Sequence, residues 1–148
     1  MSKKKNSSYL VELMMDVMPK ALQSIREEMR KGRGDRLTVP QFRVLAAINR
    51  GVCHNKEIGD LLGVSEAAIS RMIDILVKDG LIKKGTNKID RRQTVLTLTI
   101  EGQKLYNFIR ADASKRLKNK LDALSNEDVE SVIQGLIILQ KNLAILNE

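Results

Sequence analysis

Cys53 and His54 are the residues of this 148-residue chain best suited to covalent or metal chemistry, since they are its only cysteine and its only histidine. A thiol and an imidazole could act as nucleophile and base. Neighbours in sequence do not normally face one another on a regular element, however, and no third group to orient the histidine is evident. Zinc usually requires four ligands. The pair therefore predicts no enzyme, no metal and no cofactor, and leaves Cys53 as either an inert, partly buried thiol or a redox sensor.

A second kind of chemistry is indicated by residues 83–92, which hold five bases and one acid. Their net charge of +4 is half of the chain's formal +8. An arginine at the tip of a hairpin is suited to a DNA minor groove, where the negative potential is enhanced. We expect Asp90 and Arg92 to form a coupled pair in which the carboxylate orients the guanidinium. The predicted DNA contacts of this segment are Lys83, Lys84, Lys88, Asp90, Arg91 and Arg92.

Two short helices joined by a glycine turn are predicted just before these bases. The first, Asn55 to Leu62, has Ile58, Leu61 and Leu62 on one face, and Gly63 gives the backbone freedom for a tight turn. Ser65 caps the second helix. That helix has a predicted buried face made of apolar residues at helical spacing, namely Ile69, Met72, Ile73, Leu76 and Val77.

The opposite face of the second helix is polar or small, which lets a helix approach base edges closely. Arg71 can bind a guanine edge or a phosphate there. The residues predicted to face the major groove are Ser65, Glu66, Ala67, Ser70 and Arg71, and Asp74 and Lys78 lie on the same side. Gly80 ends the helix, and residues 81–99 then predict a two-stranded hairpin because positions 94–99 alternate between polar and apolar.

Longer helices flank this region. An amphipathic helix is predicted from about residue 8 to the turn at 32–34, preceded by a solvated basic arm, Lys3 to Lys5. Thr38 and Gln41 form a capping box for the next helix, with Pro40 in its first turn. A further helix is expected from Thr99 to about residue 121 or 123. Ser125 and Asp128 resemble another capping box and begin the last helix.

The last helix carries apolar residues nearly all round its axis, and a chain of this size has little to enclose them. We therefore expect a second copy to cover it, which makes the protein a homodimer suited to palindromic DNA half-sites. The alternative is packing of the first and the last two helices within one chain. The apolar residues are Val129, Val132, Ile133, Leu136, Ile137, Ile138, Leu139, Leu143, Ile145 and Leu146.

The bulk composition is that of a single globular domain, with 43% hydrophobic and 30% charged residues and a pI near 9.7. A basic chain of this kind is typical of nucleic-acid binding. The apolar run 136–139 is far shorter than the roughly 20 residues that span a bilayer, so no membrane partner is expected. With one cysteine and no secretory segment, the predicted location is the cytoplasm.

Several segments, in this order, resemble the MarR family of winged-helix regulators: residues 37–45 (LTVPQFRVL), 58–65 (IGDLLGVS), 70–76 (SRMIDIL), 78–82 (KDGLI), 90–92 (DRR) and 98–102 (LTIEG). The resemblance covers about residues 8–146. It implies a mainly α fold with a small β-wing, in which a winged helix-turn-helix at about 37–99 lies between dimerisation helices at about 8–36 and 100–146. Residues 86–89 lack the acid and prolines that family members commonly carry before the Asp-Arg-Arg motif.

The function implied by this resemblance is that of a sequence-specific DNA-binding transcriptional regulator, a repressor that binds a palindromic operator as a homodimer. The expected partners are double-stranded DNA, a second copy of the chain and a small aromatic effector that releases the DNA. Two alternatives stay open. One is a winged-helix module for protein association, suggested by Glu66 and Asp74 and opposed by the charge of the hairpin. The other is a redox-responsive regulator that uses Cys53.

Overall fold

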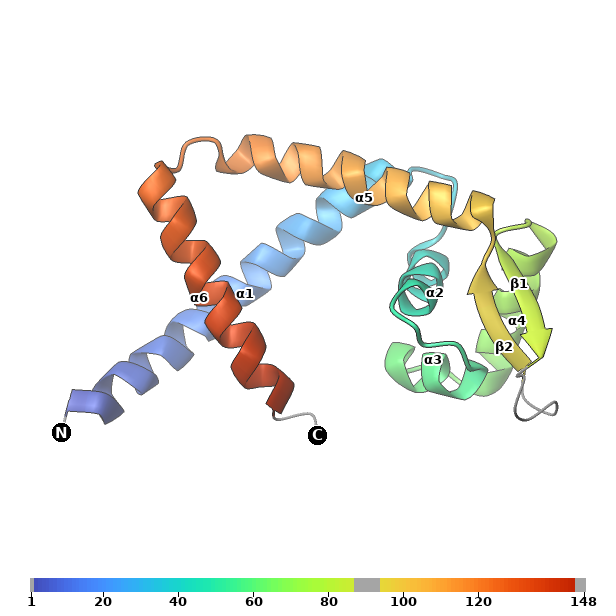
Figure 1. Ribbon diagram of the computed structural model, residues 1–148, viewed down its shortest axis with the longest axis horizontal. Helices are drawn as coiled ribbons and strands as arrows, with labels where there is room; N and C mark the ends of the chain where they lie inside the picture. The colour runs from blue at the N-terminus through green and yellow to red at the C-terminus, as the bar shows by residue number, and fades with distance from the viewer. Residues whose placement is uncertain (1, 87–93, 146–148) are drawn as a thin grey trace. The chain divides into compact units, whose positions relative to one another are not determined.

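The computed structural model describes residues 2–86 and 94–145 (Figure 1). These residues form six helices and two strands, which confirms a mainly α fold with a small β-wing. In chain order the elements are α1 (Ser2–Arg33), α2 (Val39–Asn49), α3 (Asn55–Leu62), α4 (Glu66–Lys78), β1 (Ile82–Thr86), β2 (Thr94–Leu98), α5 (Ile100–Leu121) and α6 (Asn126–Ile145).

The chain divides into two compact units, with the boundary inside α5 after Ser114. The first unit contains α1 to α4, the hairpin and most of α5. The second contains the end of α5 and α6.

Capping residues set the helix boundaries of the first unit as the sequence predicts. The Thr38 hydroxyl accepts from the Gln41 amide at 3.3 Å, and the Gln41 side chain accepts from the Thr38 amide at 2.7 Å, so the capping box is complete. Ser65 Oγ accepts from the Ala68 amide at 3.3 Å and begins α4. Gly63 has a φ of 70°, the left-handed conformation that lets the chain turn sharply from α3 into α4.

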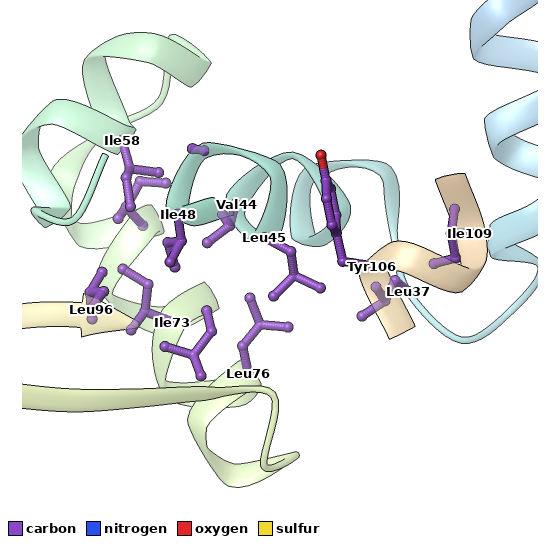
Figure 2. Packing of buried hydrophobic residues seen from close by; sticks show 13 residues of the cluster. Leu37, Val44, Leu45, Ile48, Ile58, Ile73, Leu76, Leu96, Tyr106 and Ile109 are labelled. Atoms are coloured by element: carbon purple, nitrogen blue, oxygen red, sulfur yellow. The ribbon is translucent and has the colours of Figure 1, made fainter. Parts of the chain in front are cut away.

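The hydrophobic core of the first unit lies where α2, α3, α4 and the hairpin meet, and Tyr106 and Ile109 of α5 extend it (Figure 2). Burying one large aliphatic side chain contributes about 1.5–3 kcal/mol, so this core holds the three short helices in place. The fully buried aliphatic side chains include Val44, Leu45, Ile58, Ile69, Ile73, Leu76 and Ile109.

Strands β1 and β2 are antiparallel, with Ile82 opposite Leu98 and Lys84 opposite Leu96. The Leu96 amide donates at 2.9 Å to the carbonyl of Cys53, which lies just before α3. The hairpin is thus bonded along its β2 side to the segment between α2 and α3.

A close approach joins the end of α4 to the start of α5. The Thr99 amide donates to the Leu81 carbonyl at 3.1 Å, and the Thr99 hydroxyl donates to the Gly80 carbonyl at 2.5 Å and accepts from the Gly102 amide at 3.0 Å. A Cβ atom on Gly102 would lie 2.0 Å from the Leu81 carbonyl oxygen. Only glycine leaves room for this contact.

Two local predictions were wrong. Helix α1 begins at Ser2 and not near residue 8, so it includes the backbone of Lys3 to Lys5; lysine is a good helix former, and neither glycine nor proline interrupts the helix before Pro19. Leu61 is 49% exposed, although the pattern placed it on the buried face of α3. The reason is Gly59, whose missing side chain lets α4 approach, so the buried face of α3 turns toward Gly59 and away from Leu61.

In the second unit, the Ser125 hydroxyl accepts from the Asp128 amide at 3.1 Å and donates to the Asp128 carboxylate at 2.7 Å, which begins α6 as expected. Several large apolar side chains of α6 are exposed, among them Val132, Leu136 and Ile138. In the first unit, α1 also exposes apolar side chains, including Leu13, Val17 and Leu22. Among the described residues, no helix is both long and apolar enough to cross a bilayer.

Candidate DNA-binding surface

Helix α4 presents a continuous exposed face opposite its buried residues. Arg71, Asp74 and Lys78 follow one another at spacings of three and four and lie along one line of this face. Glu66 and Ala67 are exposed in the first turn, as predicted. Ile75, which was not part of the predicted buried face, is also 49% exposed. The exposed face of α4 therefore offers one arginine and one lysine, with an acid between them.

Ser65 and Ser70 both have hydrogen-bond partners within the domain. The Ser65 hydroxyl is the α4 cap, as predicted. Ser70 is half-buried, and its hydroxyl accepts from the Asn55 side chain at 3.3 Å. Ser70 therefore ties the start of α3 to α4, a role that depends on a residue 15 positions away and has no local sequence signal.

Strand β1 places Lys83 and Lys84 beside α4, and both are exposed. The ammonium of Lys84 lies 2.6 Å from the carboxylate of Asp74. The sequence predicted each residue as part of a charged surface without pairing them. The turn at Gly80, where φ is 71°, reverses the chain and returns β1 alongside the end of α4.

The remaining predicted DNA contacts of the hairpin, Lys88, Asp90, Arg91 and Arg92, lie outside the described residues. The coupling of Asp90 to Arg92 therefore stays a prediction.

Cys53 and His54 lie on the far side of the hairpin from β1 and are half-buried. The Cys53 carbonyl accepts from Leu96, and His54 Nδ1 lies 3.1 Å from the carbonyl of Thr94. Both residues thus contact the backbone of β2. Across residues 2–86 and 94–145, no cluster of three or more His, Cys, Asp or Glu side chains could hold a metal ion. A redox role for Cys53 stays a hypothesis.

A groove of about 840 Å³ lies between α1 and α2 in the first unit, within the 300–1,000 Å³ typical of small-molecule sites. Four arginines and one glutamate give it a positive charge. Phe42 lies in its wall and stacks on Tyr106 with ring centroids 5.5 Å apart. No sequence pattern predicted this groove, although Arg26, Arg30 and Arg33 lie at helical spacing. Its lining residues are Gln23, Ile25, Arg26, Glu27, Met29, Arg30, Arg33, Val39, Phe42 and Arg43.

The geometry of α3, α4 and the hairpin defines the class of protein. Two short helices joined by a tight turn, with the second exposed along one face and followed by a two-stranded hairpin, form a winged helix-turn-helix. A helix with side chains is about 10–12 Å across, and the major groove of B-DNA is about 12 Å wide, so α4 is of a size to enter it.

Comparison with known proteins agrees with this class. Residues 37–94 match the model of the MarR family. The chain is 31% identical over 108 residues to the uncharacterised HTH-type transcriptional regulator YfiV of Bacillus subtilis, and the match covers 72% of this chain and 68% of that relative. The chain belongs to the MarR family and is a helix-turn-helix transcriptional regulator of the DNA-binding type.

Solved structures share the fold at lower sequence identity. The transcriptional regulator Tm0710 from Thermotoga maritima is similar, with a TM-score of 0.75 and 20% identity over 90% of this chain and 95% of that chain. A mutant MarR from Escherichia coli, complexed with operator DNA, has a TM-score of 0.59 and 22% identity, and the match covers 85% of this chain and 92% of that chain.

Proposed function

We propose that the protein is a repressor that binds a palindromic operator as a homodimer, with α4 in the major groove and the hairpin, or wing, against the flanking backbone or minor groove. The observation that carries this proposal is the exposed α4 face. Ile69, Ile73 and Leu76 anchor the opposite side of the helix in the core, so Arg71 and Lys78 project from a rigid element. Rigid placement is what recognition of base edges requires.

The dimer is supported by apolar surface in both units. Helix α6 and, separately, helix α1 expose large apolar side chains at helical spacing, and exposed apolar patches mark interaction sites. A second copy would remove them from water. It would also place two α4 helices on half-sites about one helical turn apart, which is why we propose a palindromic operator.

A small aromatic acid is the effector that the groove between α1 and α2 would fit. Its ring would pack on Phe42 and Met29, and its carboxylate would pair with the guanidinium groups of the wall. Helix α2 contributes Val44 and Leu45 to the same core that holds α4. A ligand that shifts α2 would therefore change the position of α4 and release the DNA.

The direct test is a mobility-shift assay on the DNA upstream of the protein's own gene, with and without an excess of nonspecific DNA. We expect a complex that survives the competitor and is dissociated by aromatic acids. Arg26→Ala should remove the response to these acids without weakening DNA binding in their absence. A complex that nonspecific DNA removes as readily as unlabelled operator would contradict the proposal, and no complex at all would favour the protein-association module.

The role of α4 is tested by Arg71→Ala, with Lys118→Ala as a control that removes one exposed positive charge from α5. If Arg71 contacts a base, its loss should cost roughly 1–3 kcal/mol of binding and relax the preference at one base position. The control should leave operator affinity nearly unchanged. A loss that is uniform over all operator variants would assign Arg71 to the phosphate backbone instead.

A further inference from the structure

We propose that Asp74 is a positioning residue for DNA recognition, which acts by holding Lys84 and thereby fixes the wing strand β1 against the recognition helix α4. On this view Lys84 is not a free cation that contacts phosphate. The inference rests on the proposed DNA-binding function and deepens it, because it separates a residue that places the wing from those that contact DNA.

The first observation is the ion pair itself. Lys84 Nζ and Asp74 Oδ1 are 2.6 Å apart, and the two side chains are 44% and 64% exposed. Asp74 lies between Arg71, three residues earlier, and Lys78, four residues later, on the face of α4 that we propose for DNA. A lone carboxylate at this place would repel a polyanion. The ammonium of Lys84 offsets that repulsion.

The second observation is the direction in which Lys84 points. Alternate residues of a strand face opposite sides, so Lys84 shares the inner face of β1 with buried Ile82, and Lys83 belongs to the outer face. The cross-strand partner of Lys84 is Leu96, whose side chain is buried. Lys84 is thus turned toward the domain, and its ammonium reaches the edge of α4.

The third observation concerns how close Lys84 and Leu96 are. The Leu96 amide donates away from β1, to the carbonyl of Cys53. Residues 84 and 96 therefore form the non-hydrogen-bonded type of antiparallel pair, in which facing side chains are closest. The aliphatic stem of Lys84 can pack along Leu96 while its charged end stays at the surface. Packing of the stem and pairing of the ammonium together limit the conformations of this lysine.

The consequence is that some residues of the wing position it and others contact DNA. An exposed ion pair contributes little to the free energy of unfolding, so folding does not depend on it. What the pair determines is the angle at which β1 leaves α4. Residues 88–92, which hold most of the predicted wing contacts, begin two positions after the last residue of this strand.

The test compares binding of Asp74→Asn, Lys84→Met and the double variant to operator DNA and to a scrambled duplex of equal length. Asp74→Asn adds one unit of positive charge, so simple electrostatics predicts tighter binding to both duplexes. We expect it to weaken operator binding about 2- to 5-fold, the range of an exposed pair, without weakening binding to the scrambled duplex. Asp74→Glu should restore most of the operator affinity.

The double variant should bind the operator no more weakly than Lys84→Met alone, because both substitutions remove the same interaction. The matched control is the exposed pair Lys104 and Glu101 on α5, whose groups are 3.2 Å apart. Lys104→Met should leave the ratio of operator to scrambled affinity unchanged. Thermal unfolding of each variant separates a positioning effect from a loss of folded protein.

Additive effects in the double variant, or tighter operator binding by Asp74→Asn, would overturn the inference. So would a lowered Tm with an unchanged affinity ratio, since that would make the pair purely structural. These outcomes leave the proposed function intact as long as the unaltered protein prefers the operator. If the unaltered protein does not distinguish the operator from the scrambled duplex, the proposed function itself fails.

Discussion

Gly102 allows the start of α5 to lie against the end of α4, and Gly102→Ala should therefore destabilise the whole first unit. The added Cβ atom would be 2.0 Å from the Leu81 carbonyl oxygen and 2.9 Å from the carbonyl carbon. Both are backbone atoms, so no side-chain rotation can relieve the contact. To restore ordinary contact, α5 and Leu81 must separate by about 1 Å or more, since carbon and oxygen atoms in contact lie roughly 3.2–3.6 Å apart.

The magnitude follows from what that separation disrupts. Overpacking of a close contact costs about 1–3 kcal/mol. The hydrogen bonds from Thr99 to the carbonyls of Leu81 and Gly80 span the same gap, and each contributes roughly 0.5–1.5 kcal/mol. Replacing glycine by alanine within a helix stabilises the helix by up to about 1 kcal/mol, which offsets part of this loss. We expect a net loss of roughly 2–4 kcal/mol, or a decrease in Tm of about 5–15 °C.

The assay is urea unfolding followed by circular dichroism at one fixed protein concentration, because a dimer's apparent stability depends on concentration. The control is Gly135→Ala, a helical glycine of α6 whose added Cβ meets nothing within 4 Å in the chain. It should be neutral or stabilising. If Gly102→Ala is also neutral or stabilising, the contact with Leu81 does not constrain the protein and the reasoning from it is wrong.

Three further predictions concern other parts of the chain. Thr38→Ala removes half of the α2 capping box and should lower the free energy of unfolding by about 1 kcal/mol, measured by urea unfolding; no change would show that the cap is dispensable. Replacing Leu136 and Leu139 with lysine should convert a dimer into a monomer in light scattering, and a monomeric unaltered protein would contradict the proposed interface. Asp90→Ala should weaken operator binding despite the gain of positive charge, and its effect should be less than additive with that of Arg92→Ala; tighter operator binding would make the wing a diffuse basic patch.

The starts of α2 and α4 and the end of α3 could be predicted from the sequence because the groups that set them lie within a few residues of one another. The Thr38 and Ser65 hydroxyls accept from amides three residues later, those of Gln41 and Ala68, and Gly63 ends α3 through its own backbone conformation. Such interactions can be recognised from the spacing of residue types along the sequence. The same holds for the buried and exposed faces of α4, where one period of 3.6 residues describes the whole helix.

The parts of the candidate site that could not be predicted depend on contacts between elements. The bond from Asn55 to Ser70 joins residues 15 positions apart, and the pair of Asp74 with Lys84 depends on how the chain turns after α4. The groove between α1 and α2 is lined by residues of both helices, so it exists only once the two helices pack together. Leu61 was misplaced because Gly59, a residue with no side chain, determines which face of α3 meets α4.

The hydrogen bond from Leu96 to Cys53 has a consequence for how the protein behaves at high concentration. A two-stranded sheet has two edges, and an open edge can pair with a strand of another molecule and start aggregation. On the β2 side, the carbonyl of Cys53 already occupies the Leu96 amide. On the β1 side, the exposed Lys83 puts charge on the edge strand, and charged residues disfavour such pairing. The segment before α3 and the charge on β1 therefore disfavour the addition of further strands to the described part of the hairpin.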